Sequence, residues 1–201
     1  MTGHPTEARA FGQAAQSIAE SLGDVALQVT GNLYHGAACL YTGDYRQAED
    51  LFRNALHFLK GDLSQERFGL AGYPAVMARA YLILGFADRG MFKEGIAQGR
   101  EGIRLAEALD HPYSLVYACW VLANLHIIRG ELGHAVPLLE RGLALAREWN
   151  LTFFSVDHTR SLGYAYALAG RIAEGIPLLE RALSSIETMG YGAVSYTHLL
   201  R

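Results

Sequence analysis

A registered internal repeat constrains this chain more than any other feature. Four segments share one pattern: GDYRQAEDLFRNAL from Gly43, GMFKEGIAQGREGI from Gly90, GELGHAVPLLERGL from Gly130 and GRIAEGIPLLERAL from Gly170. Counting from each glycine, the second residue is large and apolar, the fifth and twelfth are Gly or Ala, and the thirteenth is aliphatic. The glycines are 47, 40 and 40 residues apart. Self-similarity at such a period indicates a stacked repeat architecture.

Helical periodicity flanks each of these glycines on both sides. Apolar residues recur every three to four positions, and no alternating strand pattern competes. A glycine between two such segments supplies the positive φ that the end of a helix commonly requires. The sequence therefore predicts an all-α chain of antiparallel helical hairpins that stack into an α-solenoid with a repeat of about 40 residues.

The repeat register divides the chain into one array over residues 1–201. Its parts are a half-repeat at 3–23, hairpins at 24–60, 73–110, 111–150 and 151–190, a loop insertion at 61–72, and the start of another helix at 191–201. Half-hairpins leave apolar helix faces unpaired, whereas intact arrays normally end in polar capping helices. We therefore expect the chain to be a piece of a larger protein. We also expect the isolated chain to self-associate through its terminal helices.

Small residues inside the second helix of each hairpin predict close helix contacts. Gly95, Gly99 and Gly102 fall within one predicted helix, where each costs about 1 kcal/mol relative to Ala. A helix bears this cost when a neighbour must approach closely. We expect the paired helix of the same hairpin to press against this face.

The hairpins resemble tetratricopeptide repeats. The resemblance rests on Leu162-Gly163, Tyr166, the turn glycine Gly170 and the closing pair Ala182-Leu183, and GDYRQAEDLFRNAL is the closest match. It covers nearly the whole chain, although the period is forty residues rather than thirty-four. It implies a right-handed superhelix that binds a protein or peptide partner.

Residues 66–107 and 111–150 are also similar to a narrower group, the C-terminal repeat arrays of large bacterial signalling proteins. In that group a class III adenylate or guanylate cyclase domain and an AAA-type ATPase domain precede the repeats, and related arrays follow the ATPase of some transcriptional activators. The resemblance implies a regulatory tail in the cytoplasm that contacts a partner or its own upstream catalytic domains. No catalytic residue carries over.

Composition excludes several classes of protein. Of 201 residues, 51% are hydrophobic and 18% are charged, which is enough apolar material for a core. The 17 Lys and Arg residues are not clustered and the net charge is −3, so no nucleic-acid partner is expected. Cys39 and Cys119 do not make a disulfide framework, which favours a reducing compartment. Residues 111–128 lack charge, but they contain Pro112 and Asn124, so we expect a buried helix and no membrane span.

No catalytic, cofactor or metal motif is evident. The chain lacks a phosphate-binding loop and the H-E-x-x-H and C-x-x-C patterns. His126 and His134 straddle a predicted turn on different helices, so no metal site is expected. Asp157, His158 and Arg160 form a compact polar cluster, which we interpret as a solvated or partner-binding helix face. The sequence therefore predicts a protein that is not an enzyme.

A partner surface can be placed from geometry, because the first helix of each hairpin lines the concave side of such a superhelix. Positions thirteen, ten and six residues before the turn glycine share one helical face; in the last two hairpins they are Tyr117, Trp120, Asn124, Asp157, Arg160 and Tyr164. Two readings remain open for Tyr117 and Trp120, which either bind a partner or pack between hairpins. The alternative function is a small-molecule or peptide sensor that holds its ligand in the groove, motivated by the aromatic, uncharged stretch from Tyr113 to Ile128.

Overall fold

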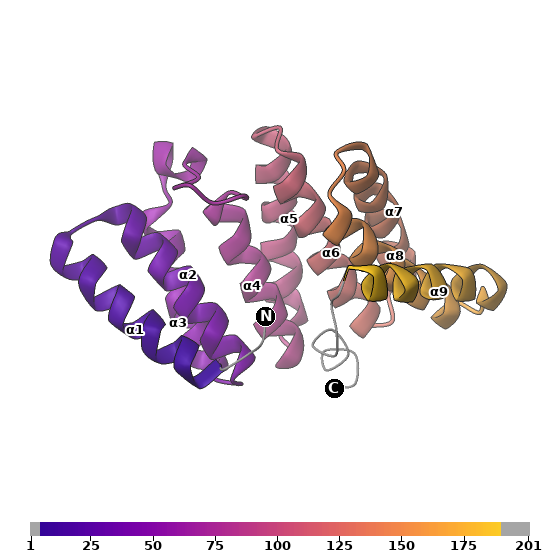
Figure 1. Ribbon diagram of the computed structural model, residues 1–201, viewed down its shortest axis with the longest axis horizontal. Helices are drawn as coiled ribbons and strands as arrows, with labels where there is room; N and C mark the ends of the chain where they lie inside the picture. The colour runs from indigo at the N-terminus through magenta and orange to yellow at the C-terminus, as the bar shows by residue number, and fades with distance from the viewer. Residues whose placement is uncertain (1–4, 190–201) are drawn as a thin grey trace.

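The computed structural model describes residues 5–189, which form a stack of antiparallel helices (Figure 1). The helices are α1 (Pro5–Leu22), α2 (Val25–Tyr41), α3 (Tyr45–Phe58), α4 (Pro74–Asp88), α5 (Phe92–Ala108), α6 (Pro112–Ile128), α7 (Leu132–Glu148), α8 (Thr152–Leu168) and α9 (Ile172–Thr188), with a short 3₁₀ helix, η1 (Gly61–Gln65), after α3. The prediction of an all-α helical solenoid is confirmed. The predicted start of the half-repeat at residues 3–4 and the predicted helix at 191–201 lie outside the described residues.

Each hairpin turns at its predicted glycine. Gly43, Gly90, Gly130 and Gly170 have φ values of 83°, 72°, 75° and 78°. The N–H of the residue after each glycine donates to the carbonyl five residues earlier; one example is Glu131 to His126, at 2.8 Å. This bond satisfies a carbonyl that the helix end would otherwise leave unpaired. The α5–α6 and α7–α8 connections use the same arrangement with a non-glycine residue at positive φ: Asp110 has a φ of 44° and Asn150 a φ of 53°.

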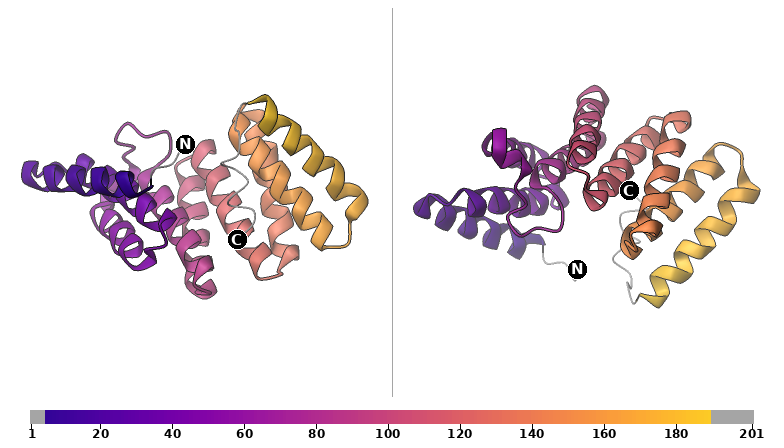
Figure 2. Two further views of the ribbon diagram at one scale, coloured as in Figure 1. Left: turned by 60° about the horizontal axis from the view of Figure 1, so that its bottom comes forward. Right: turned by 90° about the horizontal axis from the view of Figure 1, so that it is seen from above.

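The first helices form the inner layer of a curved stack. Helices α2, α4, α6 and α8 contact one another in succession. Within residues 5–189, the second helices α3, α5, α7 and α9 pack broadly only against helices adjacent in the sequence. Figure 2 shows that successive hairpins turn relative to one another along the stack. In a curved stack, helices on the inner side come closer together than helices on the outer side. Because the first helices contact one another along the stack, they lie on the inner side of the curve.

The hydrophobic core consists of several clusters of buried residues along the stack. In the third and fourth hairpins it includes Leu139, Leu143, Leu162 and Ala165, each at most 5% exposed. The segment between α3 and α4 packs Phe68 and Leu70 against the core of the first hairpins. Among the described residues, no helix, α6 included, combines the length and apolarity that a membrane span requires.

The expectation for the small residues of α5 is corrected by the structure. A Cβ at Gly95 or Gly99 would meet Leu125 or Leu122 of α6, which belongs to the next hairpin, at 2.5 and 2.6 Å. These glycines therefore receive side chains from the following repeat rather than the backbone of their paired helix. The reason is the stacking geometry, which sets α5 against α6.

Close approach of paired helices occurs instead in the fourth hairpin. A Cβ at Gly175 of α9 would lie 2.7 Å from the carbonyl oxygen of Gly163 in α8, and a Cβ at Gly163 would lie 2.9 Å from the carbonyl oxygen of Gly175. The two helix backbones touch where neither residue carries a side chain. The small residues of the array therefore serve two kinds of contact: with side chains of the next hairpin in α5, and with the backbone of the paired helix in α9.

Candidate partner-binding surface

The inner face of the array follows one register. On both α6 and α8, partly buried or exposed residues recur seventeen, thirteen, ten, six and two positions before the turn glycine; they are Tyr113, Tyr117, Trp120, Asn124 and Ile128 on α6, and Phe153, Asp157, Arg160, Tyr164 and Leu168 on α8. In each helix these five positions form one stripe of side chains, because they are three or four residues apart. We call the two stripes together the inner surface.

Aromatic rings dominate the α6 part of the inner surface. Tyr117 and Trp120 are stacked with ring centroids 6.3 Å apart, and Phe154 of α8 lies 5.7 Å from Tyr117. Tyr81 of α4 approaches Tyr117 edge-on at 6.3 Å. Burial raises the pKa of the Tyr117 hydroxyl well above its usual value. Tyr117 therefore links three successive first helices as well as facing the inner side.

A hydrogen-bonded network fixes the polar residues between α6 and α8. The indole N–H of Trp120 donates to Oγ of Ser161 at 3.2 Å, and that hydroxyl donates to Oδ1 of Asn124 at 3.2 Å. The amide nitrogen of Asn124 donates to the carbonyl of Trp120 at 2.7 Å. Because each polar group has a partner, the Trp120 ring and the Asn124 amide are held in one orientation before any ligand arrives.

Charge is confined to the α8 part of the surface. Asp157 and Arg160 form an ion pair at 3.8 Å, and their side chains are 20% and 22% exposed. Burial raises the pKa of Asp157 to about 6, and Arg160 only partly opposes this shift. Tyr164 follows one turn later with 51% of its surface exposed. This stripe offers an acid, a guanidinium and a free ring to a partner.

The interpretation of His158 as part of a solvated polar face is wrong. Its side chain is fully buried, and its Nδ1 lies 2.9 Å from the carbonyl of Phe154. Its Nε2 faces Gly142 of α7. Helical periodicity explains the error, because His158 lies next to the exposed stripe in sequence but about 100° away from Asp157 around the helix.

The sequence analysis missed the two ends of the inner surface. Tyr113 and Phe153 extend it by one helical turn at one end, and Ile128 and Leu168 extend it at the other. Ile128, Phe153 and Leu168 are each at least 50% exposed. The signal was present, because the same spacing of three and four residues continues in both directions along each helix.

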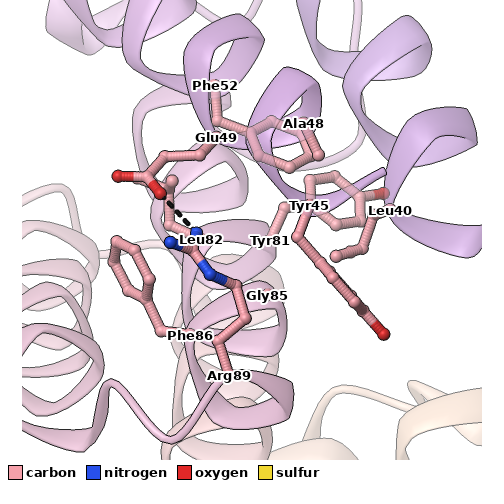
Figure 3. A pocket seen from close by; sticks show the side chains of 10 residues that line it. All are labelled: Leu40, Tyr45, Ala48, Glu49, Phe52, Tyr81, Leu82, Gly85, Phe86 and Arg89. Atoms are coloured by element: carbon pink, nitrogen blue, oxygen red, sulfur yellow. Dashed lines mark hydrogen bonds and ion pairs between the residues drawn. The ribbon is translucent and has the colours of Figure 1, made fainter. Parts of the chain in front are cut away.

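A small pocket between the first two hairpins is a packing seam. The ring of Phe52 stacks on Tyr81 at 5.1 Å, and Arg89 reaches across to Glu49 at 2.6 Å (Figure 3). The two arginines that bond Glu49, Arg89 and Arg53, hold the pKa of its carboxyl below the usual value despite partial burial. The seam holds α3 to α4 and leaves little room for a ligand.

The structure also brings together three donor groups that the sequence analysis kept apart. His126 lies in the last turn of α6, His134 lies in the first turn of α7, and Glu131 lies in the connection between the two helices. Their donor atoms all lie within 4.8 Å of one another. The tight turn at Gly130 folds the two helix ends together, so residues eight apart in sequence become neighbours.

Comparisons with known proteins bear on the fold alone. No protein-family model matches the chain, and no curated protein matches it by sequence. Among solved structures, a Rap protein complexed with competence and sporulation factor has a TM-score of 0.76 at 14% identity, over 89% of this chain and 48% of that one. This chain has the fold of a tetratricopeptide-like repeat array. It spans about half the length of the Rap chain.

Two further solved structures match along most of both chains. A single-residue variant of a Podosopora anserina putative kinesin light chain with nearly identical TPR-like repeats has a TM-score of 0.61 at 15% identity, over 96% of this chain and 100% of that one. BtubC from P. vanneervenii has a TM-score of 0.55 at 18% identity, over 95% and 94% of the two chains. The tetratricopeptide-like architecture therefore persists where sequence identity is low.

Proposed function

We propose that this chain is a non-catalytic scaffold that binds a protein or peptide partner on the inner surface of α6 and α8. The observation that carries the proposal is the alignment of aromatic and polar side chains in one register on two helices that touch. Tyr117 and Trp120 are pre-positioned by stacking and by a hydrogen bond, and Tyr164 is exposed on the neighbouring helix α8. Rigid aromatic side chains of this kind contribute strongly to binding because they lose little entropy on association.

The chemistry of the surface favours a partner with apolar or aromatic anchors. The charged groups among its ten side chains are Asp157 and Arg160, which already pair with each other. Recognition of a chain's terminal carboxylate needs several cationic or amide side chains, and among the ten side chains of the inner surface only Arg160 and Asn124 are of these kinds, which disfavours this mode of binding. We infer that the partner presents an amphipathic segment whose apolar side chains contact the α6 stripe.

The wider setting remains that implied by the sequence resemblance. We propose that the chain is the C-terminal tail of a bacterial cytoplasmic signalling protein that carries a cyclase and an ATPase domain, or of an ATPase-type transcriptional activator. The partner is then a separate protein or the upstream domains of the same chain. The tetratricopeptide-like fold supports a binding role, and the Rap structure is an example of this fold in complex with another molecule.

Binding on the inner surface can be tested with peptides selected from a display library against the purified chain. Tyr164→Ala removes an exposed ring without disturbing the core, and we expect it to weaken the selected peptides at least fivefold. Trp149→Ala is the matched control, because Trp149 is 56% exposed but lies after α7, outside the inner surface. Unchanged affinity in both Tyr164→Ala and Arg160→Ala chains would contradict the proposal.

Self-association through the terminal helices is a separate part of the proposal. Helix α1 exposes Phe11, Ile18 and Leu22 along one stripe, and α9 exposes Ile172 and Leu183. Exposed apolar stripes of this length favour contact with another surface. We expect the sedimentation coefficient to rise with concentration in the unaltered chain, and less so after Ile18→Ser. Leu63→Ser, in η1, is the control, and monomers at every concentration would contradict this part.

A further inference from the structure

The α6–α7 turn gathers two imidazoles and a carboxylate at close range. Nδ1 of His126 lies 2.7 Å from Oε2 of Glu131, and the rings of His126 and His134 are 5.2 Å apart between centroids. His126 is buried, Glu131 is half-buried and His134 is exposed. Among the described residues, this is the one group of three such side chains whose donor atoms all lie within 4.8 Å of one another.

The donor set matches the preferences of a particular class of ion. Zn²⁺ binds imidazole nitrogen and carboxylate oxygen at about 2.0–2.2 Å, which places tetrahedral ligands about 3.4 Å apart. The His126–Glu131 donor pair, at 2.7 Å, must open slightly to reach this separation, whereas no pair is further apart than 4.8 Å. Rotation of the exposed His134 side chain can bring its imidazole to the remaining distance. Two histidines and one glutamate also leave a fourth position open for water or another ligand.

The repeat provides an internal comparison. The three positions lie four before, one after and four after the turn glycine; their counterparts are Cys39, Asp44 and Gln47 in the first hairpin, Phe86, Met91 and Glu94 in the second, and Tyr166, Arg171 and Glu174 in the fourth. The fourth hairpin holds its turn with a different interaction, because the Arg171 guanidinium lies 3.7 Å from the Tyr166 ring centroid and bonds both carboxylate oxygens of Glu174. The side chains at these three positions therefore come together in both the third and the fourth hairpin, and in the third hairpin all three are groups that can bind a metal ion.

An ion can reach this group from an open pocket. Both His126 and His134 line the pocket, together with Arg104 and Glu107 of α5 and Pro137 of α7. One cation competes for the carboxylate, because Nη2 of Arg129 lies 2.9 Å from Oε1 of Glu131. The other oxygen, Oε2, is the one that faces His126.

We propose that His126, Glu131 and His134 form a binding site for a late first-row divalent metal ion, with Zn²⁺ as the reference ion. The ion ties the last turn of α6 to the first turn of α7 and so fixes the third hairpin. This site shares no residue with the inner surface and does not depend on the function proposed for that surface.

The experiment is a Zn²⁺ titration of the purified chain without an affinity tag, followed by calorimetry and by the visible absorption of Co²⁺. We expect one ion per chain, a higher melting temperature with Zn²⁺, and reversal by a chelator. Removal of an outer partner of a metal ligand already costs about 10–100-fold in affinity, so His134→Ala should weaken binding at least tenfold. His134 is exposed, so this variant should melt at the same temperature as the unaltered chain when no metal is present.

Two other variants sharpen the result. Arg129→Gln removes the competing cation and should tighten Zn²⁺ binding about threefold or more. His57→Ala removes an exposed histidine elsewhere and should leave affinity unchanged. The proposal is overturned if the unaltered chain binds Zn²⁺ only at millimolar concentrations, or if His134→Ala and His57→Ala reduce affinity equally.

Discussion

Gly102 of α5 and Gly142 of α7 occupy the same place in successive hairpins, yet their surroundings differ. A Cβ at Gly102 would meet Cβ atoms of Arg79 and Ala118 at 3.9 and 4.0 Å, which is ordinary contact. A Cβ at Gly142 would fall on the imidazole of His158. Ala118 and His158 hold the same register position, twelve residues before the next turn glycine. Because the fourth hairpin has His158 where the third has Ala118, Gly142 leaves no room for a side chain, whereas Gly102 has room for a methyl group.

The difference between Gly102 and Gly142 shows how the array accommodates a buried polar side chain, that of His158. His158 keeps one nitrogen satisfied by the Phe154 carbonyl and turns the other toward the bare backbone of α7. Burial lowers the pKa of His158 to about 4, despite the opposing effect of that hydrogen bond. The imidazole is therefore neutral in the fold near pH 7, and it occupies the space that a side chain at residue 142 would need.

The largest effect is expected for Gly142→Ala. The added methyl group must displace a buried ring, and overpacking of a close-packed core typically costs about 1–3 kcal/mol. We expect the free energy of unfolding to fall by about 2–3 kcal/mol, as measured by urea denaturation. A variant as stable as the unaltered chain would show that the His158 ring does not occupy this space.

Acid should destabilise the fourth hairpin through the same histidine. The folded state favours neutral His158, so its contribution is complete above pH 6.5 and is lost as the pH falls toward 4. The pKa shift corresponds to at most about 3 kcal/mol. Asp157 acts in the opposite sense: its neutral form is favoured, so its contribution is complete below pH 3.8 and is lost as the pH rises through about 6.

Asp157→Asn separates these two contributions. The variant should gain about 1–2 kcal/mol of stability at pH 7.5, because no buried carboxylate remains to be ionised. Its stability should also fall more steeply than that of the unaltered chain between pH 6 and pH 4. Urea denaturation across this range is the measurement, and parallel curves for the two chains would contradict the assignment.

Direct coupling between the two positions gives an effect of intermediate size. Combining Gly142→Ala with His158→Ala recreates the pairing of small residues found between α5 and α6. The double variant should be more stable than the sum of the single variants predicts by about 1–2 kcal/mol. If the effects of the two single variants simply add, the loss of stability in Gly142→Ala does not come from contact with the His158 ring.

The smallest effect has the opposite sign. Gly102→Ala adds a methyl group where there is room and replaces a residue that costs a helix about 1 kcal/mol. We expect stability to rise by about 0.5–1 kcal/mol, measured as a higher urea midpoint. A loss of stability would mean that α5 and α6 are as tightly packed as α7 and α8.

The hairpins could be predicted from sequence because they depend on local chemistry. Gly43, Gly90, Gly130 and Gly170 each adopt the positive φ that their position between two periodic segments requires. Contacts between hairpins were not predictable in the same way. Gly99 receives Leu122 from the next repeat because of how far each hairpin rotates on its neighbour, and no residue type encodes that rotation directly.

The candidate sites show the same division. Tyr117, Trp120 and Tyr164 could be placed on one face because helical spacing alone decides that. The burial of His158 depends on tertiary structure, because its ring occupies the space beside Gly142 of α7. The approach of His126 to His134 depends on the tight turn between α6 and α7. Treating the positions around each turn glycine as one register would have brought the two histidines together.

The contact pattern of the two layers has a mechanical consequence. Because α2, α4, α6 and α8 touch in succession while the outer helices pack broadly only against their sequence neighbours, the described part of the array can flex by opening gaps at its outer edge. Such flexing keeps the buried leucines of each hairpin in place and changes mainly the curvature. If a partner binds on the inner surface of α6 and α8, as proposed above, the elastic resistance of the array to bending opposes any change of curvature that binding requires, and such a change alters the distance between α1 and α9.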